Sequence, residues 1–80
     1  MKLIHNFTES SIVIGCNYHT KWQTKPQMRF VLEYVFEDRA KISTKTTGKC
    51  FWTNISDLIF ILSDHNIKKA IKLSENYENR

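Results

Sequence analysis

Four basic residues in the middle of the chain are spaced so that they could bind the phosphates of a nucleic acid. Arg39, Lys41, Lys45 and Lys49 follow one another with no acidic residue between the first and the last. On a strand, residues two apart share a face at a separation of about 6.5–7 Å, which is close to the repeat of a nucleic-acid backbone. Trp52 could add stacking on bases. The simpler interpretation is the solvent face of an edge hairpin, where lysines discourage edge-to-edge pairing.

Aromatic residues are the second candidate for a binding site. The residues that could line one groove between a long loop and the hairpin are Tyr18, Trp22, Tyr34, Phe51 and Trp52. Pro-rich peptides dock between aromatic rings because their extended helix is preformed, and a quaternary cation binds in an aromatic cage. For Tyr34 and Phe51 core packing is the simpler interpretation. Trp22 stands in a polar loop, and both interpretations stay open for it.

Metal binding and catalysis have weaker support. Cys16 and His19 have the spacing of a metal-binding pair, but a structural zinc site needs a second pair, which the sequence lacks. A buried Cys16 acting as a small hydrophobic residue is the better interpretation. Any chain with two cysteines and three histidines allows a nucleophile and a base to be paired. The chain has no nucleophile elbow, no phosphate-binding glycine loop and no HExxH motif. We therefore expect a protein that is not an enzyme and that holds no metal or cofactor.

Composition limits the classes of protein. The 80 residues suffice for one domain with a small core, and a net charge of +4 suits either nucleic acid, an acidic partner or simple solubility. No apolar run is long enough to span a membrane. Two cysteines and no recognisable signal peptide favour a reducing, bacterial-type cytoplasm. The oligomeric state stays open.

Alternating apolar residues and turn signals predict five short strands. An arm or short strand occupies 1–10, a polar loop with the only proline occupies 19–28, and a turn with a glycine occupies 46–49. The predicted strands are 11–18, with a bend at Gly15, then 29–37, 39–45, 50–55 and 59–62, with a 3₁₀ turn over 56–58.

Two further predictions concern side-chain faces and the C-terminus. In 29–37, Phe30, Leu32, Tyr34 and Phe36 should share one face of the strand, and the sequence does not decide which face is the core. A helix over 63–74, capped by Ser63 or Asp64 or alternatively by Asn66, should be followed by a polar tail over 75–80. The helix is too short to be stable alone, so it must pack on the rest of the domain.

The segment 11–61 resembles an SH3-like small barrel. The long loop 19–28 matches the first loop of that architecture, and FWTNISDLIFI (51–61) matches its ending of strand, 3₁₀ turn and strand. The eukaryotic ALYDY-like stretch is absent, since the chain has NYHTKW at 17–22, and the Gly-rich turns of KOW-type barrels are absent as well. The chain is also similar to short uncharacterised bacterial proteins.

This resemblance implies a mainly β single domain over 1–80, a five-stranded barrel over 11–62 with a C-terminal helix. It also implies binding at the groove beside the first loop. We therefore expect a small binding or adaptor module. Its partner would be nucleic acid, held by Arg39, Lys41, Lys45, Lys49 and Trp52, or a protein or peptide, held by Tyr18, Trp22 and Trp52.

Overall fold

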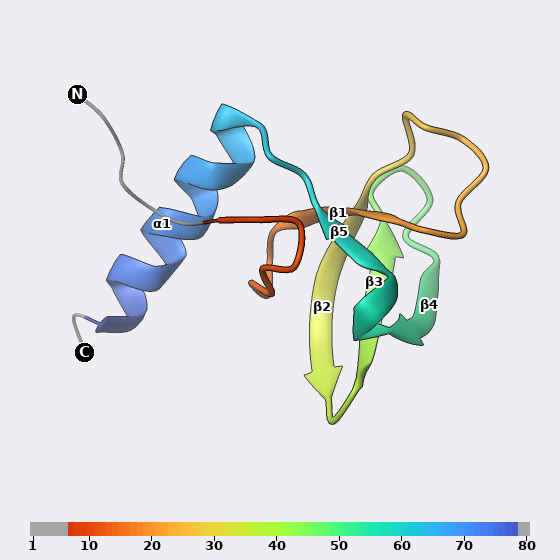
Figure 1. The fold of residues 1–80 in the computed structure, drawn as a ribbon, viewed down its shortest axis with the longest axis horizontal. Coiled ribbons are helices and arrows are strands. Elements are labelled where there is room, and N and C mark those ends of the chain that lie inside the picture. The colour runs from red at the N-terminus through yellow and green to blue at the C-terminus, as the bar shows by residue number, and fades with distance from the viewer. Residues whose placement is uncertain (1–6, 79–80) are drawn as a thin grey trace.

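The computed structural model describes residues 7–78 of the chain. Within these residues the protein is mainly β, with five antiparallel strands, one 3₁₀ turn and one C-terminal helix (Figure 1). In chain order the elements are β1 (Asn17–Thr20), β2 (Phe30–Phe36), β3 (Arg39–Thr44), β4 (Cys50–Asn54), η1 (Ile55–Asp57), β5 (Leu58–Phe60) and α1 (Asp64–Glu78). The predicted terminal segments fall partly at 1–6 and 79–80, which lie outside the described residues.

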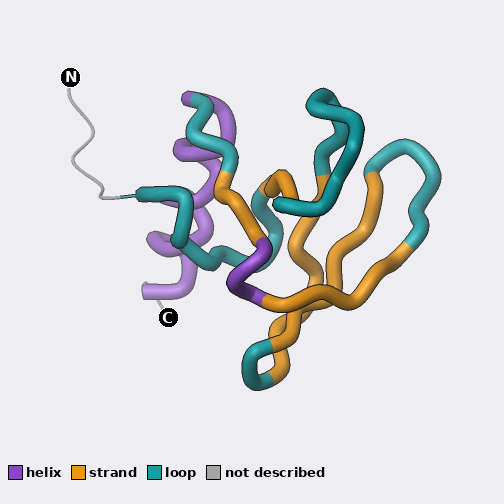
Figure 2. The backbone as a smooth tube through the Cα atoms, turned by 45° about the vertical axis from the view of Figure 1, so that its right-hand side comes forward, coloured by secondary structure: helices purple, strands orange, loops and turns teal. Residues whose placement is uncertain are grey.

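The strands form one sheet in the order β4-β3-β2-β1-β5. Every neighbouring pair is antiparallel, and β1 lies between β2 and β5, so that Tyr18 faces Phe60 across strands far apart in sequence. The strands curl rather than lie flat (Figure 2). Among the described residues, β4 and β5 are the two edges of the sheet and do not pair with each other, although η1 links them along the chain. The open, curled sheet is therefore what is established, and closure into a barrel stays a prediction.

The core gathers side chains from the sheet and from α1. The buried apolar residues in contact with one another are Cys16, Tyr18, Phe30, Leu32, Ala40, Ile42, Leu58, Phe60 and Ala70. The ring of Phe60 stacks on Phe7 at 5.4 Å and meets the edge of Tyr18 at 5.5 Å. Burying one such aromatic side chain contributes on the order of 1.5–3 kcal/mol, so these rings supply much of the stability of a small core.

The strand predicted over 11–18 is only partly correct, because β1 starts near its end and the residues before it form turns. The Tyr18 hydroxyl donates to the Ser11 carbonyl at 3.0 Å and accepts from the Val13 N–H at 2.6 Å. These bonds hold the segment around the tyrosine, and Gly15 makes the predicted bend with φ of 99°. These hydrogen bonds from a nearby side chain thus override the strand preference of the β-branched residues. Two of those residues are exposed: Ile12 and Ile14.

The second predicted strand is present as β2, but it contains a β-bulge. Leu32 pairs with Ile42 and Tyr34 pairs with Lys41, so that Glu33 is an extra residue on β2. Side chains on a strand alternate with a period of two. An extra residue therefore moves every later side chain to the opposite face.

The bulge corrects the prediction that four residues of β2 share a face. Phe30 and Leu32 are buried in the core, whereas Tyr34 and Phe36 are exposed. Val35 takes over the inward position and packs against the core. Before the bulge, Phe30 and Leu32 lie on the inner face of β2 and are buried. After the bulge, Tyr34 and Phe36 lie on its outer face and are exposed.

The hairpin from β3 to β4 agrees with the prediction to within one residue. Ala40, Ile42 and Thr44 are buried, as the alternation indicates. Gly48 has φ of 73° in the turn, a left-handed conformation that glycine adopts without strain. The 3₁₀ turn starts at Ile55, one residue earlier than predicted. The last strand is shorter than predicted, and Leu62 is exposed beyond its end.

Helix α1 lies beside the sheet, with the red segment that precedes β1 between them (Figure 1). Ser63 caps it, because the Ser63 Oγ accepts from the Asn66 N–H at 3.2 Å. Ala70 and Ile71 are buried on its inner side. The helix runs to Glu78, past the predicted end at 74, so residues 75–78 of the predicted tail are helical.

Candidate functional site

Two exposed aromatic rings meet on the outer face of the sheet. Tyr34 on β2, Lys41 on β3 and Trp52 on β4 are register partners and form one row across three strands. The rings of Tyr34 and Trp52 are 52% and 51% exposed, and their centroids lie 6.3 Å apart, edge to face. Because β2 and β4 are two strand spacings apart, about 9.6 Å, the rings lean towards each other over half-buried Lys41.

The neighbouring row adds one more ring and one more cation. Phe36 pairs with Arg39, and Arg39 pairs with Asn54 on β4. Phe36 is 56% exposed, and Arg39 is exposed beside it. The two rows together form the outer aromatic face, which comprises Tyr34, Phe36, Arg39, Lys41 and Trp52. Among the described residues, no carboxylate forms an ion pair with Arg39 or Lys41.

An acidic residue interrupts the predicted row of basic residues, which comprises Arg39, Lys41, Lys45 and Lys49. Glu33 reaches over β3 from the bulge, and its Oε2 accepts a hydrogen bond from the Ser43 Oγ at 2.6 Å. Ser43 lies between Lys41 and Lys45 in the alternation of β3. The structure therefore brings Arg39 and Lys41 together beside Trp52, and it separates Lys45 from them.

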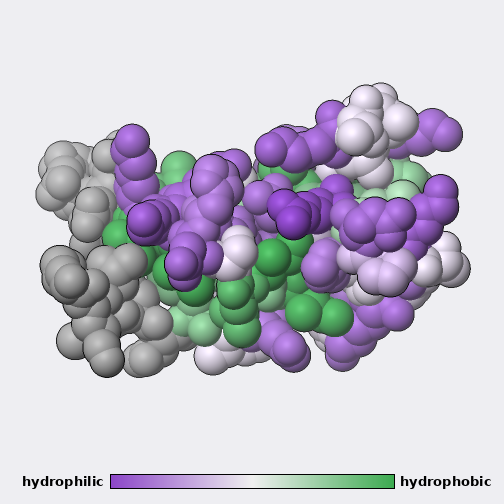
Figure 3. Space-filling model, turned by 90° about the horizontal axis from the view of Figure 1, so that it is seen from above, coloured by the Kyte–Doolittle hydropathy of each residue, from purple (hydrophilic) through white to green (hydrophobic). Residues whose placement is uncertain are grey.

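Lys45 belongs to a second cationic feature, a hollow of about 340 Å³ between the loop 21–29 and the turn after β3. We name it the basic hollow; its lining residues are Lys25, Gln27, Met28, Arg29, Thr44, Lys45 and Thr46. None of these residues is acidic. Lys49 lies in the adjacent turn, where its carbonyl accepts from the Thr44 N–H at 3.0 Å. Figure 3 shows hydrophilic side chains gathered at this right-hand end of the molecule, while apolar ones show nearer the middle.

Gln23 holds the loop side of the basic hollow in shape. Its Oε1 accepts from the Thr20 N–H at 2.8 Å, and its Nε2 donates to the carbonyls of Lys25 at 2.7 Å and Met28 at 3.0 Å. A backbone bond from Met28 N–H to the Lys25 carbonyl closes the turn between them. One side chain thus ties the loop to the end of β1.

Trp22 folds back from the loop onto the inner side of the sheet. Its Nε1 donates to the Thr53 Oγ1 at 2.9 Å, and its ring lies 5.6 Å from Phe30 and 6.2 Å from Phe51. The Trp22 side chain remains 45% exposed, so one part of it packs against the sheet and another part faces the solvent.

The five aromatic residues predicted to line one groove therefore lie in different parts of the fold. Tyr18 is fully buried and bound to backbone groups, so it does not line a groove. Trp22 and Phe51 lie together at one side of the sheet, while Tyr34 and Trp52 lie on the opposite face because Phe51 and Trp52 are consecutive on a strand.

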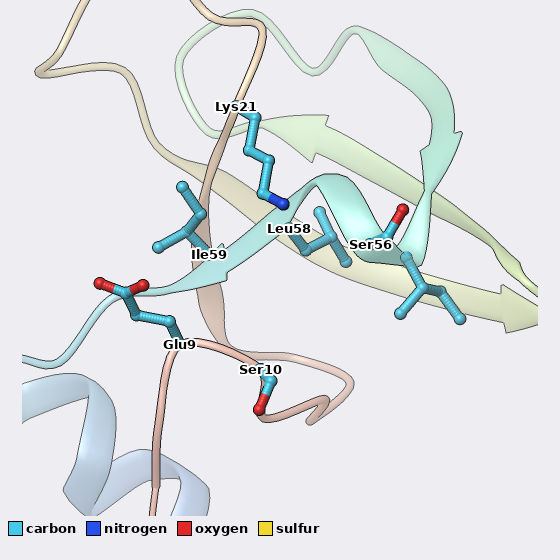
Figure 4. Close-up of a pocket in the computed structure, with 7 residues that line it drawn as sticks. Glu9, Ser10, Lys21, Ser56, Leu58 and Ile59 are labelled. Carbon is cyan, nitrogen blue, oxygen red and sulfur yellow. The ribbon is translucent and has the colours of Figure 1, made fainter.

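A second hollow, of about 280 Å³, lies along β5 (Figure 4). Glu9 and Lys21 enter it from different segments, and Figure 4 shows Ile59 between them. Four further residues complete the lining: Ser10, Ile55, Ser56 and Leu58. A carboxylate and an ammonium group in one shallow hollow select no single class of ligand.

Among residues 7–78, which leave out His5, the thiols and histidines do not gather into a reactive cluster. Burial raises the pKa of Cys16, so its thiol stays protonated near neutral pH and is a poor nucleophile. Its Sγ lies 4.0 Å from the Asn66 carbonyl oxygen, whereas Cys50 is exposed at the other side of the sheet. Within residues 7–78, no three His, Cys, Asp or Glu side chains are placed to hold a metal ion.

Sequence reasoning did not consider three contributors to these surfaces for binding, Phe36, Lys25 and Arg29. It named Tyr34 as a possible groove residue but took core packing as the simpler interpretation. The clustering of Lys25, Arg29 and Lys45 could have been suspected from the pairing of β2 with β3, which places Arg29 opposite Lys45 just beyond Phe30 and Thr44. No local signal marks the bulge at Glu33.

Comparison with known proteins finds no matching family model, no matching curated protein and no matching solved structure. In the part of the chain that the structure describes, no helix is long and apolar enough to cross a membrane. The functional conclusion therefore rests on the chemistry of the two cationic surfaces.

Proposed function

We propose that this chain is a non-enzymatic binding module of SH3-like architecture that holds single-stranded nucleic acid on its outer aromatic face. The strand order, with β1 between β2 and β5 and a 3₁₀ turn leading into β5, supports that architecture. The observation that carries the function is the pair of half-exposed rings, Tyr34 and Trp52, around a lysine that has no acidic partner within the described part of the chain.

Exposed aromatic rings and cations on one face suit unpaired bases. A base stacked on an aromatic side chain contributes about 1–3 kcal/mol, and every base offers a ring face, so the contact tolerates different sequences. Arg39 and Lys41 supply positive charge next to the rings, where the phosphates of a stacked strand would lie. The bases of a duplex are already stacked on each other, so single strands should bind more tightly than duplexes.

The test is the binding of a fluorescently labelled twelve-residue oligothymidylate, followed by anisotropy at low salt. Trp52→Ala and Tyr34→Ala should each weaken binding by on the order of tenfold, because each removes one stacking surface. A matched control is Leu62→Ala, which removes an exposed apolar side chain of similar exposure, 52%, at a distance from this face. Circular dichroism verifies that every variant is folded.

Two results would contradict the proposal. One is an unchanged anisotropy at micromolar protein and low salt. The other is a Trp52→Ala variant that binds as tightly as the Leu62→Ala control.

A peptide ligand is the second candidate, and the exposed part of Trp22 beside Phe51 favours it. A peptide held between these rings would bind with little dependence on salt, since the contact is apolar. Trp22→Ala would weaken such binding and leave the oligothymidylate affinity unchanged. The two candidates use opposite faces of the sheet and are therefore separable by these variants.

A further inference from the structure

The basic hollow combines groups that suit one phosphate. Lys25, Arg29 and Lys45 approach it from two segments, and no carboxylate lines it. Thr46 and Gln27 add uncharged hydrogen-bond donors to the same lining. Charged donors form the stronger hydrogen bonds to phosphate oxygens, and the guanidinium of an arginine can bind two oxygens at once.

The backbone that carries these cations is fixed before any ligand binds. Gln23 bonds to the carbonyls of Lys25 and Met28 on the loop side. On the hairpin side, the Thr44 N–H bonds to the Lys49 carbonyl at 3.0 Å, and the Gly48 N–H bonds to the Thr44 carbonyl at 3.0 Å. Because both segments are held, binding would need to order only the side chains of the cations, which lowers its entropic cost.

The basic hollow also lies within reach of the outer aromatic face. Lys45 follows Lys41 by four residues, which corresponds to about 13 Å along a strand. Glu33 occupies the interval between them through its bond to Ser43. An extended single strand could pass this acidic position and place a phosphate beyond it, at the hollow.

We propose that the basic hollow holds a phosphate group of the same single strand whose bases stack on the outer aromatic face. This inference rests on the proposed function, since it requires a strand on that face. It predicts a length threshold: a strand of two nucleotides reaches only the rings, whereas one of about four or more also reaches the hollow, because about 13 Å corresponds to roughly two further backbone repeats.

The experiment measures oligothymidylates of two, four, six and eight nucleotides against the whole chain and the double variant Arg29→Gln with Lys45→Gln. The control is Lys68→Gln with Lys72→Gln, which removes the same charge from the exposed side of α1. For eight nucleotides, the hollow variant should lose on the order of tenfold in affinity relative to the control. For two nucleotides, the two double variants should bind equally. Chemical shift spectra verify that both retain the fold.

The salt dependence provides a second readout. Each phosphate contact in a single strand contributes about −0.7 to the slope of log affinity against log salt concentration. The hollow variant should therefore have a shallower slope than the control for eight nucleotides and the same slope for two. Strands with and without a terminal phosphate distinguish the source of the group. A gain for short phosphorylated strands identifies a terminal phosphate, and dependence on length alone identifies an internal one.

The results separate the two proposals. If the hollow variant binds all lengths as the control does while Trp52→Ala loses affinity, the role of the hollow is overturned and the aromatic face stands. If Trp52→Ala binds normally, the proposed function fails, and with it the length threshold. Equal losses for the hollow variant and the α1 control would mean that only net charge matters, which also overturns a phosphate site in the hollow.

Discussion

Tyr18 carries an ionisable hydroxyl into the core, and its environment makes the folded state sensitive to alkaline pH. Burial raises its pKa from 10 to about 12, against a smaller opposing effect of the hydrogen bond to Val13. The charged form is thus disfavoured in the folded protein. In the unfolded chain the hydroxyl would ionise near its ordinary pKa. The difference links proton release to unfolding.

We expect the free energy of unfolding to fall as the pH rises from 10 to 12. The stabilisation by neutral Tyr18 is complete below pH 10 and is lost between the unfolded and the folded pKa, with a total of roughly 2–3 kcal/mol for two pH units. Urea unfolding between pH 8 and 12 measures it. The Tyr18→Phe variant should be less stable at pH 8 but should lose less stability above pH 10. Parallel profiles for the two proteins would refute this linkage.

Helix α1 is held against the sheet by the buried amide of Asn66 as well as by the packing of Ala70 in the core. Asn66 is buried, its Oδ1 accepts from the Asn17 N–H at 2.9 Å, and its Nδ2 donates to the carbonyls of Asn17 at 2.9 Å and Ile61 at 2.8 Å. These bonds join the helix, the start of β1 and the segment after β5. Since a short helix is marginal alone, its position depends on such contacts.

Replacing this amide should loosen the helix from the sheet. In Asn66→Ala, the buried Asn17 N–H and the part-buried Ile61 carbonyl lose their side-chain partner, and the expected loss of stability is about 2–4 kcal/mol. The control is Ser63→Ala, which removes only the helix cap and should cost about 1 kcal/mol. Urea unfolding followed by circular dichroism measures both. A loss in Asn66→Ala no larger than in the control would show that the amide does not anchor the helix.

The elements that the sequence predicted well are those specified locally. The β3–β4 hairpin has strict alternation on β3 and a glycine where the turn needs a positive φ, so its bounds follow from nearby residues. The bounds of β1 do not follow from strand preferences, because the hydrogen bonds of the Tyr18 hydroxyl to Ser11 and Val13 hold residues 11–13 outside the strand. The faces of β2 do not either, because a bulge depends on register with a partner strand.

The sequence predicted only part of each candidate surface, because only some of the contacts in these surfaces are specified by nearby residues. The sequence grouped Lys41 with Trp52, and the register of β3 with β4 places them side by side. It also grouped them with Lys45, which lies instead with Arg29 and Lys25 at the basic hollow. Which side chains lie together on one hairpin can be predicted from the alternation of residues along its strands. Which side chains of a loop lie beside a distant turn can be predicted only when the pairing of all the strands is known.

At the scale of the whole molecule, a net charge of +4 predicts binding that depends on salt. With two to four phosphates contacted, the slope of log affinity against log salt concentration should lie between roughly −1.5 and −3 for a twelve-residue oligothymidylate. Anisotropy titrations between 20 and 200 mM salt measure the slope. A slope near zero would favour the apolar, peptide-binding alternative at Trp22.

The extra residue in β2 has a consequence for how such a domain can change over generations. One inserted codon at Glu33 suffices to turn the remainder of an interior strand inside out, so that Tyr34 and Phe36 emerge where they would otherwise be enclosed. Phe30, Leu32 and the inward Val35 remain constrained by packing, whereas the exposed Tyr34 and Phe36 can vary in character with little effect on folding. A very short chain thereby separates the part that keeps it folded from the part that is free to acquire a ligand.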